Sequence, residues 1–257
     1  MEENKSTSTE TVEAPKKSFA KWLDNYWYHY KWHTIAVIFV LLVVTVCVVQ
    51  MAGRTDYDVV ITYAGSKNVS QKSENGGTAE IITMQTSLKD VVYDIDENGE
   101  VTVNLEPLFW LSAAEISALE AELAEKRENG EIVTDEINYN LLSSNYNTVD
   151  NLMLSGDCFL WFMSDDLYDY INKKSDVGRF VDLSGIPDGD STVEFYGDDT
   201  CAIYLKSTEF YKMPGIRDLP EDTLIVVRKL GIGANKSTKR AYEAALEIAE
   251  NIINYEY

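Results

Sequence analysis

Carboxylates are the most numerous side chains in this chain that could take part in chemistry. Its 257 residues include 43 acidic and 22 basic ones, which gives a formal net charge of −21. A chain this acidic repels a phosphate backbone, so nucleic acid is excluded as a partner. The two histidines, His29 and His33, both lie near the amino end. This placement argues against a Ser-His-Asp triad or a histidine-based metal site in the remainder of the chain.

One acidic motif resembles the beginning of a calcium-binding loop. It reads D-x-D-x-N-G at residues 94–99. Such a loop needs a bidentate Glu at its twelfth position, where this chain has Leu105. We therefore expect a hairpin turn between two strands, Val91–Ile95 and Glu100–Leu105, and no metal site. No cofactor is predicted.

Two adjacent carboxylates, Asp165 and Asp166, stand at the predicted start of a helix. Neighbouring side chains diverge from a helix start, so their spacing does not make a general acid and base pair. We assign no catalytic residue. An extracytoplasmic hydrolase would need a carboxylate pair drawn from residues far apart in the sequence.

Two cysteines, Cys158 and Cys201, each stand at the beginning of a predicted strand. If those strands are neighbours, the two sulfurs could form a disulfide. The alternative is two buried thiols.

The most informative segment is the uncharged run Thr34–Gly53. Its 20 residues would span about 30 Å as a helix, the thickness of the hydrocarbon core of a bilayer. We predict a transmembrane helix with the lipid bilayer as its partner. A cleaved signal peptide is the alternative, but its apolar core would begin closer to the amino terminus.

An aromatic segment precedes this run. Residues 22–32 contain six aromatic side chains, which suits the headgroup layer of a membrane. We expect residues 19–33 to lie at the interface, with Trp22, Trp27 and Trp32 as anchors. Residues 1–18 are polar and are predicted to be a disordered cytoplasmic tail.

The charge distribution suggests an orientation. Four lysines lie in the 20 residues before the span and three basic residues in the 20 after it, a small excess on the amino side. The residues beyond the span hold 38 of the acidic and 17 of the basic groups. We expect a cell-membrane protein with a cytoplasmic amino end and an extracellular domain at residues 54–257.

The outer domain shows strand and helix patterns in alternation. Strands are predicted from short β-branched or apolar runs, and helices from capping residues followed by apolar spacing. The strands are Asp58–Ala64, Cys158–Met163, Cys201–Leu205 and Thr223–Val227; Ala79–Gln85 fits a strand or a helix; helices begin at Ser112, Thr148, Ser164 and near Ser237. This alternation predicts an α/β or α+β layered domain.

Residues Leu152–Leu183 combine a short helix, a buried strand and a capped helix from Asp165 to about Lys174, followed by Gly178 and Asp182-Leu183. This segment resembles extracellular solute-binding proteins of the type 2 periplasmic fold. The strand at Asp58–Gly65 resembles the first strand of that family, Lys206–Lys212 its return into the first lobe, and Ser237–Asn254 its closing helix. The amino-terminal NYWYHYKWHTI is similar to single-span proteins of Gram-positive bacteria that carry such an outer domain.

The resemblance implies a three-layer lobe with a cleft at the carboxyl ends of its strands. Tyr63, Gly65, Ser164 and Asp165 would lie nearest to a ligand there. A simpler interpretation is that Ser164 only caps the following helix. Because 74 residues follow Leu183, we expect the second lobe to be reduced or absent.

Three functions follow from these observations. The first is a non-catalytic, membrane-anchored protein that binds an unknown solute or a membrane-protein partner. The second is an extracytoplasmic hydrolase that uses carboxylates. The third is an accessory subunit of a transporter or a secretion complex.

Overall fold

The computed structural model of the chain describes residues 19–52, 57–69, 79–133, 136–155, 158–174, 178–188 and 192–257. The predicted tail, residues 1–18, lies outside this part of the chain. The chain divides into two compact units, Met1–Thr55 and Asp56–Tyr257.

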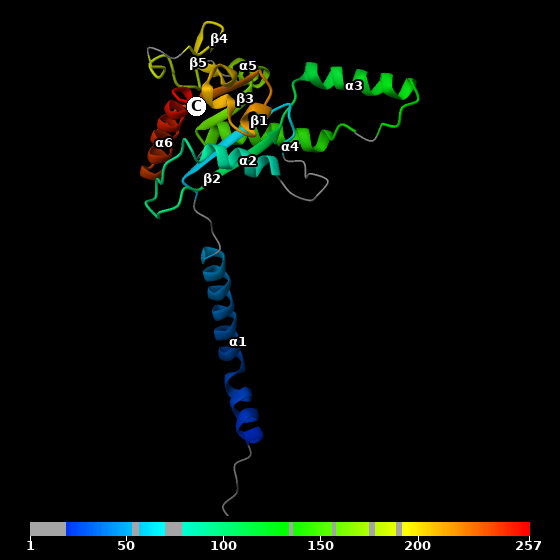
Figure 1. Ribbon diagram of the computed structural model, residues 1–257. Helices are drawn as coiled ribbons and strands as arrows, with labels where there is room; N and C mark the ends of the chain where they lie inside the picture. Colours follow the sequence, from blue (N-terminus) through cyan, green and yellow to red (C-terminus); the bar gives the residue numbers. More distant parts are fainter. Residues whose placement is uncertain are drawn as a thin grey trace, which may run out of the picture. The chain divides into compact units, whose positions relative to one another are not determined.

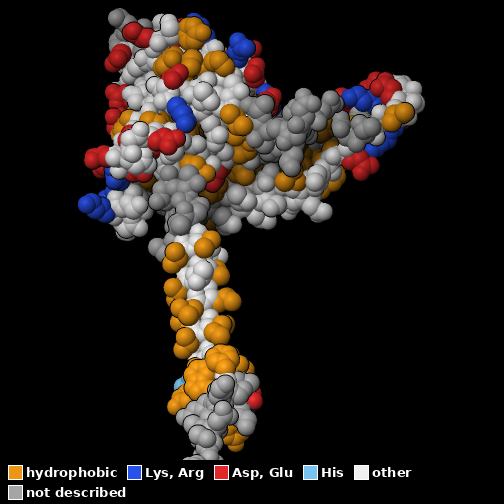
Figure 2. Space-filling view, turned by 60° about the horizontal axis from the view of Figure 1, so that its bottom comes forward, with side chains coloured by type: hydrophobic (Ala, Val, Ile, Leu, Met, Phe, Trp, Pro, Cys, Tyr) orange, Lys and Arg blue, Asp and Glu red, His pale blue; other side chains and the backbone are white. Residues whose placement is uncertain are grey.

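The first unit contains one long helix, α1 (Phe19–Ala52). Its segment Trp22–Gln50 is long and apolar enough to cross a membrane, and none of its most apolar window is buried. Figure 2 shows apolar side chains along this helix. The helix therefore includes both the predicted span and the aromatic segment before it. The side chains of Trp22, Trp27 and Trp32 are all exposed.

The second unit is built on one sheet of six strands in the order β2-β1-β3-β6-β5-β4 (Figure 1). The strands are β1 (Val59–Gly65), β2 (Val103–Phe109), β3 (Leu160–Ser164), β4 (Phe195–Tyr196), β5 (Asp199–Tyr204) and β6 (Thr223–Val227). Strand β1 pairs in parallel with both β2 and β3, whereas β6 runs antiparallel to β3 and to β5. The prediction of a mixed α/β domain is confirmed.

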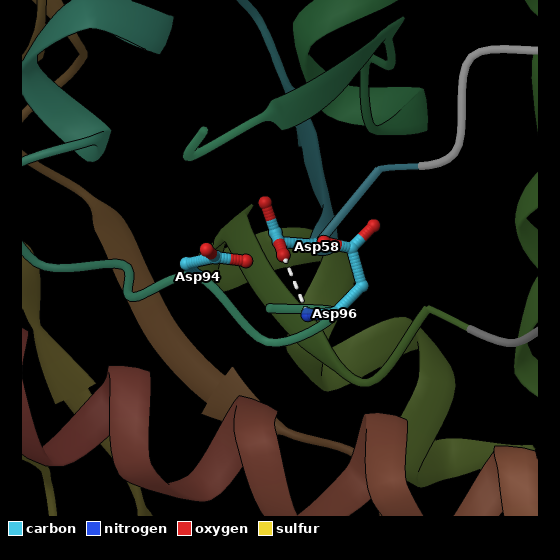
Figure 3. A group of neighbouring side chains, drawn as sticks. All are labelled: Asp58, Asp94 and Asp96. Carbon is cyan, nitrogen blue, oxygen red and sulfur yellow. Dashed lines mark hydrogen bonds between the residues drawn. The ribbon is translucent and has the colours of Figure 1, made fainter. Parts of the chain in front are cut away.

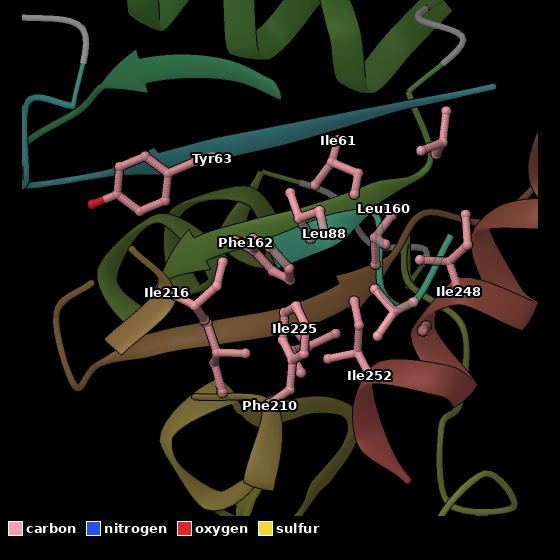
Figure 4. Packing of buried hydrophobic residues seen from close by; sticks show 14 of the residues in the cluster. Ile61, Tyr63, Leu88, Leu160, Phe162, Phe210, Ile216, Ile225, Ile248 and Ile252 are labelled. Atoms are coloured by element: carbon pink, nitrogen blue, oxygen red, sulfur yellow. The ribbon is translucent and has the colours of Figure 1, made fainter. Parts of the chain in front are cut away.

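Side chains alternate between the two faces of the sheet along each strand, and each face has its own hydrophobic core. Ile61, Leu160 and Ile225 point to one face, where they pack against α2 (Ala79–Leu88) and α6 (Lys236–Ile253) (Figure 4). Three short 3-10 turns, Leu205–Ser207, Glu209–Lys212 and Ile216–Asp218, add to this layer. Trp161 and Val226 point to the other face, against α4 (Tyr139–Ser155) and α5 (Asp165–Lys173). Helices on both faces of the sheet make three layers.

Several helix ends follow the sequence closely. Ser112 and Glu115 form the predicted capping box of α3 (Ala113–Glu128), and Ser164 caps α5. The segment that fitted either a strand or a helix is helix α2, with Met84 and Leu88 buried on its inner face.

Two local predictions are wrong. Thr148 does not begin a helix; it lies inside α4, where its hydroxyl donates a hydrogen bond to the Ser144 carbonyl at 2.9 Å. The helix begins earlier because the Asn138 side chain accepts the Leu141 amide at 3.0 Å. Residues 91–105 do not form a hairpin, since β2 pairs in parallel with β1.

Candidate functional site

The order of the strands reverses at β1. The chain goes from β1 to β2 on one side and returns to β3 on the other. The helix before β2, α2, contributes to one core, and α4, before β3, contributes to the opposite core. In open α/β sheets, ligands bind outside the carboxyl ends of strands at such a reversal. The predicted residues Tyr63, Gly65, Ser164 and Asp165 all lie at the carboxyl ends of β1 and β3.

Tyr63 is buried beneath this edge. Its ring is inaccessible to solvent, and its hydroxyl accepts the Lys67 amide at 3.2 Å. A Cβ at Gly65 would lie 2.9 Å from that hydroxyl, so Gly65 provides the space that the Tyr63 side chain occupies. Burial raises the pKa of Tyr63, so the phenol stays neutral. Tyr63 therefore has a structural role: it packs beneath the carboxyl edge of the sheet and holds the Lys67 backbone there.

Ser164 is also buried, and its hydroxyl accepts the Leu167 amide at 3.4 Å. This is the contact expected of a helix cap. Asp165 is partly exposed at the first position of α5, where it accepts the Asp166 amide at 2.7 Å. Of the four predicted residues, Asp165 is the one whose polar group is available to a ligand.

The structure brings a second carboxylate to this edge, Asp222, which sequence reasoning missed. Ser164 pairs with Thr223 in the antiparallel register of β3 and β6. Asp165 follows Ser164 and Asp222 precedes Thr223, so the two aspartates are neighbours just beyond this last pair. Burial raises the pKa of Asp222, and the charge of Asp165 raises it further. Burial also raises the pKa of Asp165. The sequence carried no signal for this proximity, because it depends on the pairing of β3 with β6.

Neither carboxylate has a cationic partner among the described residues. The ion pairs of that part of the chain include neither Asp165 nor Asp222. Glu115 lies close enough to raise the pKa of Asp222 as well. Lys206 lies near this edge, but its Nζ is 3.8 Å from the Glu221 carboxylate and 4.9 Å from the centre of the Tyr204 ring. The edge therefore carries more negative than positive charge.

Two tyrosines lie beside these carboxylates. The rings of Tyr196 and Tyr204 are 5.9 Å apart at their centroids. Burial and the charges of Asp169 and Asp165 raise the pKa of Tyr196 to about 12. Burial and the charge of Asp165 raise the pKa of Tyr204. The edge therefore combines carboxylates with neutral aromatic side chains, which can attract a cation by charge and through the ring faces.

A second acidic group lies apart from this edge, where the start of β1 meets the loop before β2. The carboxylates of Asp58, Asp94 and Asp96 offer oxygens that lie within 4.8 Å of one another (Figure 3). The Asp58 carboxylate accepts the amides of Ile95 and Thr102, each at 2.7 Å. Partial burial alone would raise the pKa of Asp58, but these backbone hydrogen bonds outweigh it and lower the pKa below 3.8.

The Asp94 carboxylate is occupied in the same way, since it accepts the Gly99 amide at 2.7 Å. Glu97 and Gly99 adopt positive φ angles of 61° and 90° in this loop. Carboxylate hydrogen bonds to the backbone therefore explain why the predicted hairpin does not form here. A metal ion bound to these oxygens would compete with those hydrogen bonds.

The two cysteines of the second unit, Cys158 and Cys201, are free thiols. Strand β6 lies between β3 and β5, and Cys158 lies two residues before β3. The two cysteines are therefore separated by more than two strand spacings, roughly 10 Å or more, and the condition for a bridge is not met. The Cys158 thiol is buried, and the Thr62 hydroxyl donates a hydrogen bond to its sulfur at 3.0 Å. Burial raises the pKa of Cys158 to about 12 and that of Cys201 to about 11.

Comparisons with protein-family models, with curated proteins and with solved structures gave no match.

Proposed function

We propose that this protein is a membrane-anchored, non-catalytic binding protein whose outer domain binds a primary amine at the carboxyl edge of β1 and β3. One observation carries the proposal. Asp165 and Asp222 are neighbours across β3 and β6, both pKa values are raised, and neither carboxylate pairs with a Lys or Arg among the described residues. A bound ammonium group would stabilise both negative charges.

The aromatic side chains at the same edge favour the same ligand class. Tyr196 and Tyr204 lie close enough to Asp165 for its charge to raise their pKa values. An ammonium group held by the carboxylates could also lie over a tyrosine ring, which contributes about 0.5–2 kcal/mol to binding. The resemblance of Leu152–Leu183 to solute-binding proteins supports the same edge as the place where a solute binds.

The apolar helix α1 supports attachment to a membrane. The excess of acidic residues beyond the span and the lysines before it support an extracytoplasmic position of the outer domain. In this arrangement the site would be open to amines outside the cell.

The test uses the full-length protein in nanodiscs of zwitterionic lipid. Thermal unfolding is followed with added 1,4-diaminobutane and, as a neutral control of the same length, butane-1,4-diol. A ligand that binds the folded state raises Tm by mass action, so the diamine raises Tm and the diol does not. Asp165→Asn and Asp222→Asn each abolish this shift, whereas the exposed control Asp90→Asn keeps it. A diamine shift of equal size in all four proteins, or no shift in the wild type, contradicts the proposal.

A carboxylate hydrolase is the second candidate, favoured by the raised pKa values of Asp165 and Asp222. A raised pKa is the direction expected of a carboxyl group that acts as a general acid. The same variants decide between the two functions. Release of p-nitrophenol from p-nitrophenyl glycosides that is lost in both Asp→Asn variants would establish the hydrolase.

A further inference from the structure

A small cavity lies between α4 and α5, at the opposite end of β3 from the edge described above. Helix α4 ends just before β3, and α5 begins just after it and runs back along it. The cavity has a volume of about 250 Å³ and is lined by Asp150, Met153, Leu154, Ile171, Lys174 and Arg179. The described lining thus includes two cations, Lys174 and Arg179, and one carboxylate, Asp150.

Arg179 supplies the positive charge of this cavity. Its Nε is buried and has no hydrogen-bond partner within the described ranges. A buried donor of a charged group without an acceptor destabilises the folded state, because water no longer reaches it. An acceptor within the cavity would remove this penalty.

Lys174 contributes less to the positive charge of the cavity, because the Asp150 carboxylate already neutralises its ammonium group. Its Nζ lies 2.9 Å from the Asp150 carboxylate and 4.2 Å from the centre of the Tyr170 ring. With this pair neutralised, the described part of the lining keeps the single positive charge of Arg179. The guanidinium group presents its donors in a plane that matches the two oxygens of a carboxylate or a phosphate.

The other lining residues within the described ranges are apolar: Met153, Leu154 and Ile171. It offers a surface for a short alkyl group beside the guanidinium. We propose that this cavity binds a small organic anion, in which a phosphate or carboxylate pairs with Arg179 and a short alkyl group contacts the apolar lining. This site is independent of the amine site and does not rest on the function proposed above.

Such an anion could be a soluble molecule or the headgroup of a membrane lipid. The test therefore titrates butyl phosphate into the full-length protein in two kinds of nanodisc and measures the heat of binding. One kind contains phosphatidylcholine alone, and the other also contains phosphatidylglycerol. Equal affinity in both supports a soluble anion, whereas weaker binding with phosphatidylglycerol supports the same cavity with a lipid headgroup as its natural ligand. Inorganic phosphate serves as the probe that lacks the alkyl group, and butylammonium as the probe that lacks the negative charge.

Two variants of the lining decide whether the cavity is the site. Arg179→Gln removes the charge, and the affinity for butyl phosphate falls by about tenfold or more. Leu154→Glu places a carboxylate in the lining at a side chain that is 70% exposed, so folding is unaffected while the anion is repelled. Arg217→Gln, at a side chain that is 65% exposed on the opposite helix layer, is the matched control and keeps wild-type affinity.

The pattern expected is binding of butyl phosphate that is tighter than binding of inorganic phosphate and is weakened in both lining variants. Absence of measurable binding to the wild type would overturn the proposal. Equal affinity in the wild type, Arg179→Gln and Leu154→Glu would do so as well. Binding of butylammonium with similar strength would show that the cavity does not select an anion.

Discussion

Asp58 illustrates how a carboxylate can organise a loop in place of a metal ion. It precedes β1, yet it accepts backbone amides at Ile95 and Thr102, both far along the chain. These hydrogen bonds join the start of the first strand to the start of the second. The contacts are non-local, so the D-x-D-x-N-G motif alone could not reveal them.

We expect Asp58→Asn to lower the free energy of unfolding by roughly 1–2 kcal/mol at pH 7, because charge-assisted hydrogen bonds to the backbone are lost. The pKa of Asp58 is lowered in the folded state. Its contribution to stability is therefore present above pH 3.8 and is lost as the pH falls through the lower folded pKa. Urea unfolding between pH 2 and pH 7 measures the free energy of unfolding at each pH. On acidification this free energy should fall less in the variant than in the wild type. An equal loss in both proteins would contradict the assignment.

Asp222 has the opposite effect on stability. Its pKa is raised by burial and by Asp165, so its ionised form is unfavourable in the folded state. We expect Asp222→Asn to raise the free energy of unfolding by about 0.5–1 kcal/mol at pH 7, the usual range for exposed charge pairs. The gain should disappear below pH 3.8, where the carboxyl group is protonated in both states. A variant that is less stable than the wild type at pH 7 would show that Asp222 has a stabilising partner.

Helix ends were the elements that the sequence predicted best. Ser112 with Glu115 and Ser164 cap the helices that they were expected to cap, because these contacts are made within four residues. Strand β6 spans Thr223–Val227, as its β-branched run predicted. In each case the residues within the element, or within four positions of its end, were sufficient to predict it.

Elements that depend on distant partners were predicted less well. The Glu97–Gly99 segment carries a hairpin signal, but the strand after it pairs in parallel with β1 and not with Val91–Ile95. Proximity of Asp165 and Asp222 likewise depends on the register of β3 and β6. A layered domain of helices and strands was predictable from the alternating patterns. The order of the strands, and with it the position of Asp222 beside Asp165, was not.

Ser164 connects β3 to α5 through one hydrogen bond, so its removal tests the junction. We expect Ser164→Ala to lower the free energy of unfolding by about 1 kcal/mol, the usual effect of a lost helix cap. Ser117→Ala in α3 is the matched control, because Ser117 is an exposed helix-interior residue whose hydroxyl bonds to the Ala113 carbonyl. Denaturant unfolding measures both variants. Equal effects of the two substitutions would argue against a capping role for Ser164.

The proposed attachment to a membrane would depend on α1, which is long and apolar enough to cross a bilayer. Val40 and Val43 lie within the uncharged run, with exposed fractions of 58% and 43%. The double substitution Val40→Arg/Val43→Arg adds about 5–7 kcal/mol to the cost of insertion into a bilayer. We expect the variant to be extracted from membranes by alkaline carbonate, while the wild type and the control Val40→Leu/Val43→Leu stay in the pellet. Retention of the Arg variant in the pellet would show that the helix is not the anchor.

Helix α1 continues without a break from its aromatic part into its apolar part. Phe19, Trp22, Tyr26 and Tyr30 stack in sequence along one side of it, with ring centroids 5.9, 5.8 and 5.4 Å apart. Each residue turns an α-helix by about 100°, so the direction in which this stack points is coupled mechanically to the rotation of the apolar part about its own axis. One extra residue inserted between His33 and Thr34 would leave composition and hydrophobic length almost unchanged, yet it would turn the stack by more than a quarter of a revolution relative to the apolar part of the helix.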